Sequence, residues 1–217
     1  MLPNGWCFLG LAIDADENVE WLRAAVQDLL DRHERVLLLL ETELDSYDQG
    51  VEPPAEATDL PPAAMTEQLA DLTMRRWRAV DAVRHRFPAS TIGRVQIATW
   101  SNFVDPTFAS LWRRLLTAFG VGATFRRDVL RLGNRRLKSW RSRADSAQAA
   151  RAASLRAIES LAMRLRIGEV AGYHHEYGRE RESPVAERLY KGHYAEEGLT
   201  VASLVGHPAR RSFRELT

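Results

Sequence analysis

The sequence predicts an α/β protein in which a central, mostly parallel sheet is covered by helices on both faces, giving three layers. Two observations predict this class. Apolar runs at residues 6–13 and 35–40 show no polar alternation, and the segment between them has apolar residues at helical spacing. A strand, a helix and a second strand within about 35 residues form a βαβ unit. Continuously apolar strands are typical of parallel sheets that are buried on both faces.

The first half of the chain supplies this unit, a long loop and a further helix. The loop contains four prolines and no basic residue, so we expect an acidic, Pro-rich segment without helical periodicity. The helix after it has apolar residues on one side and ends before Pro88. The expected order is strand, helix, strand, loop and helix at 6–13, 17–31, 35–40, 41–64 and 66–87.

The second half begins with a third strand at 94–100. Asp105 is then a helix N-cap followed by Pro106 at the first helical position, and the apolar residues after them repeat at i, i+3, i+4 and i+7. The remaining expected elements are a helix around 146–166, strands near 168–173 and 199–205, and a basic tail at 206–217. We expect residues 1–217 to form a single domain.

The net charge of +1 conceals an uneven distribution along the chain. Residues 1–71 carry sixteen Asp or Glu and three Arg, a net charge of −13, so residues 72–217 carry +14. The basic residues are 28 Arg and only 2 Lys. Genome base composition can by itself explain the preference for Arg. Arginine forks nevertheless match phosphate geometry, so the basic part of the chain favours a polyanionic partner.

Two clusters of arginine lie within this basic part. The helix at 66–87 carries Arg75 and Arg78 on one stripe, with further basic residues nearby, and residues 126–143 contain eight basic residues and one Asp. A solvated helix face is the ordinary explanation of such a stripe. Because the charges have nearly one sign and the pattern occurs twice, we expect a phosphate-binding surface whose affinity falls with salt.

Several other classes of protein are not expected. A single cysteine, Cys7, excludes an intrachain disulfide, and no apolar run approaches the roughly 18 residues that span a bilayer. Because the start also lacks a signal sequence, we expect a cytoplasmic protein without membrane association. There is no Gly-rich phosphate loop, cysteine pair or HExxH motif. Asp14 and Asp16 are explained as helix caps more simply than as metal ligands, so no metal or cofactor is expected.

The order of these pieces resembles one known family. Six segments account for the resemblance. The first three are Leu9-Gly10-Leu11-Ala12 at the end of the first strand, the second strand with the acid that follows it, and the Arg-rich helix. The others are a strand with paired helices, the Tyr173-His174 pair, and a turn with a last strand. In chain order they lie at 9–12, 36–41, 74–86, 94–131, 173–174 and 197–205. Together they resemble the tRNA-dependent cyclodipeptide synthases, collinearly over most of the chain.

The resemblance implies a Rossmann-like domain similar to the catalytic domain of class I aminoacyl-tRNA synthetases. That family joins two aminoacyl groups from aminoacyl-tRNAs into a cyclic dipeptide. For this chain it implies Glu159, Tyr173 and His174 as catalytic residues, and Ala12 and Asp14 in the substrate pocket. It also implies a tRNA-binding set of Arg75, Arg76, Arg78, Arg84, Arg86, Arg126 and Arg127.

Two departures from the family bear on mechanism. The family's nucleophilic serine, which accepts the first aminoacyl group, corresponds to Ala12, and alanine cannot form an acyl enzyme. A family tyrosine one helical turn before Glu159 corresponds to Leu155. Glu159 itself has an alternative interpretation as a surface residue paired with Arg156.

Three functions are consistent with these residues. The first is an aminoacyl-tRNA-dependent transferase in which an acceptor amine attacks the tRNA ester directly, with Glu159 as proton acceptor and Tyr173 orienting the substrate. The acceptor would be a second aminoacyl-tRNA, an amino acid or a small amine. The second is a non-catalytic relative that binds aminoacyl-tRNA or RNA. The third is an unrelated Rossmann-like enzyme that acts on a small anionic substrate.

Overall fold

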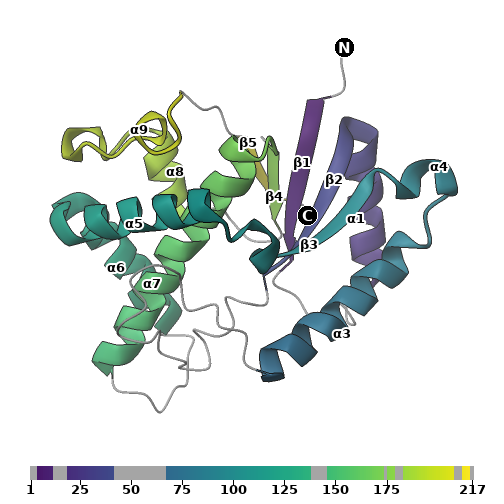
Figure 1. The fold of residues 1–217 in the computed structure, drawn as a ribbon, viewed down its shortest axis with the longest axis horizontal. Helices are drawn as coiled ribbons and strands as arrows, with labels where there is room; N and C mark the ends of the chain where they lie inside the picture. Colours follow the sequence, from purple (N-terminus) through teal and green to yellow (C-terminus); the bar gives the residue numbers. More distant parts are fainter. Residues whose placement is uncertain are drawn as a thin grey trace.

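Five parallel strands form one continuous sheet in the order β3-β2-β1-β4-β5 (Figure 1). This order is that of the Rossmann-type sheet, so the predicted fold class is confirmed. The strands are β1 (Asn4–Leu11), β2 (His33–Leu40), β3 (Val95–Thr99), β4 (His175–Gly178) and β5 (Ser212–Glu215). The computed structural model describes residues 4–11, 19–41, 67–137, 146–173, 175–178, 183–207 and 212–215.

Helices cover the two faces of the sheet and complete the three layers (Figure 1). On one face lie α1 (Val19–Arg32) and α3 (Glu67–Arg84), followed by the short α4 (Ala89–Ile92). The elements of the other layer are η3 (Trp100–Phe103), α5 (Pro106–Val121), α6 (Ala123–Leu137), α7 (Ser146–Leu165), η4 (Arg166–Val170), α8 (Pro184–Tyr190), η5 (Ala195–Glu197) and α9 (Val201–Val205). Along the described segments, no helix has the length and apolar character needed to cross a membrane.

Alternation along the strands explains why the sheet is apolar on both sides. In β1, Leu9 packs with the core under α1 and α3, whereas Phe8 packs with the core under α5 and α7. In β2, Leu38 and Leu39 divide in the same way. Successive side chains of a strand point to opposite faces, so a strand with a core on each side has no polar face.

The N-terminus of α5 forms as the sequence predicts. Asp105 precedes Pro106, and its carboxylate accepts a hydrogen bond from the backbone N–H of Phe108 at 2.8 Å. The same carboxylate accepts hydrogen bonds from Nε and Nη2 of Arg166, and Nη2 lies 2.7 Å from Oδ2. These donors favour the charged form, and the bond from Arg166 contributes most to lowering the pKa of Asp105.

Replacing Asp105 by alanine should lower the free energy of unfolding by about 2 kcal/mol at neutral pH, because the cap and a partly exposed ion pair are both lost. The pKa of Asp105 is lowered from 3.8, so this stabilisation is present above that value and disappears as pH falls through the folded-state pKa. Urea unfolding of both proteins at about pH 7 and about pH 3 measures the difference. Asp105→Asn, which keeps an acceptor for the cap, should lose less. An equal deficit at both pH values would contradict the assignment.

Two expected strands are wrong. Residues 166–170 form a π-helical turn, and the strand begins two residues after the expected span, at His175. Residues 201–205 form α9, because Thr200 caps the helix by accepting from the N–H of Ser203, and Gly206 ends it at φ 86°. The last strand is instead β5, which lies inside the segment expected to be only a basic tail. The acidic loop expected at 41–64 lies, apart from Glu41, outside the described residues.

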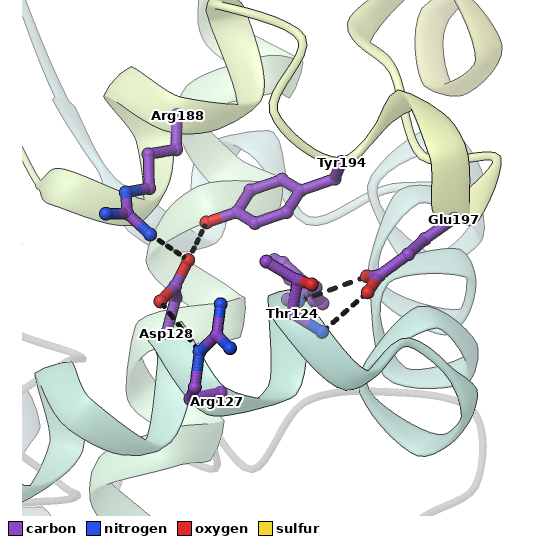
Figure 2. Close-up of polar contacts among 7 residues, drawn as sticks. Thr124, Arg127, Asp128, Arg188, Tyr194 and Glu197 are labelled. Carbon is purple, nitrogen blue, oxygen red and sulfur yellow. Dashed lines mark hydrogen bonds and ion pairs between the residues drawn. The ribbon is translucent and has the colours of Figure 1, made fainter.

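Polar contacts connect α6 to α8 and to the segment that follows α8 (Figure 2). Asp128, 7% exposed, accepts hydrogen bonds from Arg188 at 2.6 Å and from the hydroxyl of Tyr194 at 3.1 Å. Burial and the neighbouring Asp128 carboxylate raise the pKa of Tyr194. The carboxylate of Glu197 accepts the backbone N–H groups of Thr124 and Phe125 at the first turn of α6. This layer is therefore fixed by specific polar bonds as well as by its apolar core.

Candidate functional site

The carboxyl edge of the sheet is the expected ligand-binding region. In open parallel sheets, ligands bind beyond the carboxyl ends of the strands, where the strand order reverses. Here the reversal lies between β1 and β4, whose last residues include Gly10, Leu11 and Gly178. Neighbouring polar side chains come from just beyond β2 and β3 and from α7. Helix α7 packs on the sheet face that also carries α5 (Figure 1).

A buried carboxylate on α7 is fixed at this edge. Trp100 follows β3 directly, and its indole Nε1 donates a hydrogen bond to Oε1 of Glu159 at 2.9 Å. Both residues are fully buried. The interpretation of Glu159 as a surface residue is therefore wrong. The bond to Trp100 orients the carboxylate, which is what a fixed proton acceptor requires.

A second charged group lies on the same face. Arg164, one turn further along α7, forms an ion pair with Glu176 in β4, and its Nη2 lies 3.8 Å from Oε1 of Glu41. Its Nε also donates to the hydroxyl of Ser160 at 3.2 Å. Both acids are buried, Glu41 at 8% exposed and Glu176 at 2%. Arg164 therefore lies between a carboxylate that directly follows β2 and one from β4, the two strands that flank β1.

Gly10 provides the space that this arrangement needs. A Cβ built on Gly10 would lie 2.6 Å from Oε1 of Glu41, a distance that Cβ atoms do not adopt. The Glu41 side chain therefore lies over the backbone of Gly10. Glu41 follows the last pair of β2 with β3, Leu40 with Thr99, so it stands beside Trp100 at the same edge.

The structure does not bring Tyr173 to Glu159. The Tyr173 hydroxyl donates to Oε1 of Gln96 at 3.0 Å, and its ring packs 5.4 Å from that of Trp6. Trp6 lies near the start of β1, and Tyr173 precedes β4, so Tyr173 is at the amino edge of the parallel sheet. This position does not support the expectation that Tyr173 orients a substrate beside Glu159. A strand at 168–173 would have ended at Tyr173, whereas the observed strand starts after it.

Three expected site residues, Ala12, Asp14 and His174, lie outside the described residues. The two residues after His174 point to opposite faces of β4, as alternation along a strand requires: the ring of His175 packs 4.9 Å from that of His33, whereas Glu176 pairs with Arg164. Within the described ranges, no group of three His, Cys, Asp or Glu residues is placed to hold a metal ion.

The arginines expected to bind tRNA divide into different environments. Arg75 and Arg78 are exposed on α3 and have no hydrogen bond or ion pair with any residue that the structure describes. Arg76 is only 9% exposed, on the side of α3 that covers the sheet. This burial does not support its expected membership of the tRNA-binding set, because helical spacing puts Arg76 with Val80 and Val83.

The other four arginines are more exposed than Arg76. Arg84 pairs with Asp81 at 2.9 Å, and Arg86 pairs with Glu20 at 3.2 Å. Arg126 and Arg127 are exposed on α6, which belongs to the layer opposite α3 (Figure 1). The two arginine clusters therefore lie in different layers of the fold.

Sequence reasoning missed Trp100, Arg164, Glu41 and Glu176 as members of a site. Two signals in the sequence could have indicated this site. Glu41 and Trp100 each directly follow an apolar strand, and such positions meet at the carboxyl edge of a parallel sheet. In the sequence, Glu176 follows two histidines and carries no signal of its own for this site. Its role depends on which strand face it occupies, and that required the true start of β4.

Comparison with known proteins agrees with this fold. No protein-family model and no curated protein sequence matches the chain. Solved structures do match over nearly its whole length. A CDPS, or cyclodipeptide synthase, from Fluoribacter dumoffii is 15% identical, with 97% of this chain and 88% of that one covered and a TM-score of 0.67. A cyclodipeptide synthase from Candidatus Glomeribacter gigasporarum, solved bound to Phe-tRNAPhe, is 12% identical, with coverage of 100% and 89% and a TM-score of 0.60.

A third structure relates this fold to a larger class. It is a Mycobacterium tuberculosis protein described as demonstrating that cyclodipeptide synthetases are related to type I tRNA synthetases. It is 13% identical, with coverage of 86% and 77% and a TM-score of 0.60. The chain is thus a Rossmann-like α/β protein, similar in fold to structures of this class. More narrowly, it has the cyclodipeptide-synthase fold, which confirms at the level of structure the resemblance found in the sequence.

Proposed function

We propose that this protein is an aminoacyl-tRNA-dependent transferase that forms an amide bond, passing an aminoacyl group from tRNA directly to an amine. The acceptor is a second aminoacyl-tRNA, a free amino acid or a small amine. No serine acyl enzyme is formed, because the position of the family nucleophile is Ala12.

The observation that carries the proposal is Glu159, a buried carboxylate fixed by Trp100 at the carboxyl edge of a cyclodipeptide-synthase fold. Two further observations support it. One structural neighbour was solved with Phe-tRNAPhe bound. The exposed Arg75 and Arg78 supply cations without a described protein partner, which suits a phosphate backbone.

The reaction needs little more than positioning, because an aminoacyl ester is already activated. The acceptor nitrogen attacks the ester carbonyl and forms the new C–N bond, and Glu159 takes the proton that the nitrogen releases. The ester C–O bond then breaks, and the terminal ribose oxygen of the tRNA leaves and receives that proton. No cofactor and no external oxidant or reductant enters this balance.

Incubating the protein with a complete aminoacyl-tRNA pool, followed by mass spectrometry for dipeptides and aminoacyl conjugates, tests the proposal. We expect products that disappear when the pool is treated with RNase beforehand. Tight binding of the pool without any product would indicate a non-catalytic tRNA-binding relative. Product formation that survives RNase treatment would contradict the proposal and indicate an enzyme that uses a small free substrate.

Tyr173→Phe is expected to change turnover by less than about two-fold, because the hydroxyl bonds Gln96 at the amino edge and not a group near Glu159. It should lower the free energy of unfolding by about 1 kcal/mol, the net value of one hydrogen bond. Steady-state rates and urea unfolding measure the two effects. A hundred-fold loss of turnover with unchanged stability would restore Tyr173 to the active site.

A further inference from the structure

Glu41 is a buried acid whose pairing is weak. Its side chain is 10% exposed, and no hydrogen bond reaches its carboxylate from the residues that the structure describes. Its one ion contact is the 3.8 Å approach of Arg164, which also pairs with Glu176. By contrast, the buried carboxylate of Asp128 accepts bonds from both Arg188 and Tyr194. Burying a carboxylate is costly unless charge and hydrogen bonds compensate it, so Glu41 retains capacity for a cationic ligand.

The position of Glu41 indicates where a cationic ligand would bind. It directly follows β2, beside Trp100, the residue that holds Glu159. Its carboxylate lies over Gly10, next to the point where the strand order reverses. The absence of a side chain at Gly10 is what leaves room for it. A ligand at this edge would therefore meet two carboxylates, one fixed by Trp100 and one weakly paired.

We propose that Glu41 binds the protonated α-amine of the aminoacyl group carried by tRNA. This inference rests on the proposed function and deepens it, because it assigns separate carboxylates to the two amines of the reaction. A carboxylate within about 4–6 Å favours the charged form of an amine. Held by Glu41, the donor amine stays protonated and does not attack, while the acceptor amine loses its proton to Glu159.

Equilibrium binding to three probes tests this assignment: phenylalanyl-tRNA, phenyllactyl-tRNA, which carries a hydroxyl in place of the ammonium, and uncharged tRNA. The native protein should bind phenylalanyl-tRNA about ten- to a hundred-fold more tightly than phenyllactyl-tRNA, the range of one charged hydrogen bond. In Glu41→Gln, which keeps the size of the side chain, this preference should fall to less than about three-fold while binding of uncharged tRNA is unchanged.

Two further variants complete the experiment. Gly10→Ala should reduce the preference as well, because its Cβ would displace the Glu41 carboxylate. Glu187→Gln, on the exposed surface of α8 and paired with Lys191, should keep the native preference. The inference is overturned if the native protein does not distinguish the two acylated probes, or if Glu41→Gln keeps the full preference. Failure of all three tRNAs to bind would instead overturn the proposed function itself.

Discussion

Replacing Glu159 by glutamine should lower kcat for amide formation by about 10²- to 10³-fold, the usual contribution of a positioned proton acceptor. Glutamine keeps the size of the side chain and an oxygen that can accept the Trp100 indole N–H, so the fold should be retained. The amide oxygen has little basicity, and the acceptor nitrogen therefore keeps its proton. Binding of aminoacyl-tRNA should change by less than about two-fold, because the variant removes a function needed only during bond formation.

Single-turnover rates with preloaded aminoacyl-tRNA, together with equilibrium binding, separate these two effects. Glu187→Gln serves as the matched control, since it makes the same chemical change at an exposed position of α8. An equal loss in both variants would indicate a general effect of charge. A variant at Glu159 that turned over normally would remove this residue from the mechanism.

Replacing Arg75 and Arg78 together by glutamine should weaken tRNA binding by about ten-fold at moderate salt and reduce the slope of log Kd against log salt by about 1–2. Both side chains are exposed and have no partner among the described residues, so their removal costs the protein no contact that the structure shows. Arg76 is not a suitable third site, because it is buried and its replacement would disturb packing.

The control for this pair is a double replacement of Arg113 and Lys191 by glutamine. It changes the net charge by the same amount but lies on exposed positions of the opposite layer. Filter binding over a range of salt concentrations measures both variants. If the control lost as much affinity as the α3 variant, the attraction would be that of overall charge and not of a defined surface.

The local patterns of the sequence predict most of the fold, since they depend on neighbouring residues. Apolar runs define β1 and β2, and the Asp105-Pro106 pair defines the start of α5. The failures occur where two patterns compete over a few residues. Residues 199–205 have strand-like composition, yet the capping pair of Thr200 and Ser203 makes them helical.

The site could be predicted only in part. The resemblance indicates Glu159, but its burial and its bond to Trp100 depend on how α7 packs. These two residues are 59 positions apart in the sequence, so no local pattern predicts their contact. A strand at 168–173 would end at Tyr173 and place it at the carboxyl edge of the sheet. The observed strand starts after Tyr173, so this residue lies at the amino edge. The approach of Arg164 to Glu41 depends on the missing side chain of Gly10, which no periodicity indicates.

The most direct test of direct transfer follows the label of a radioactive aminoacyl group during a single turnover quenched in acid. The proposal predicts that label leaves the donor tRNA and appears in the amide product, a small amide or a dipeptidyl-tRNA, at the same rate, with none bound to the protein. Glu159→Gln should slow both events equally. Label that first accumulated on acid-precipitated, RNase-treated protein would contradict direct transfer. Label that stayed on the donor tRNA as the original aminoacyl ester would contradict catalysis altogether.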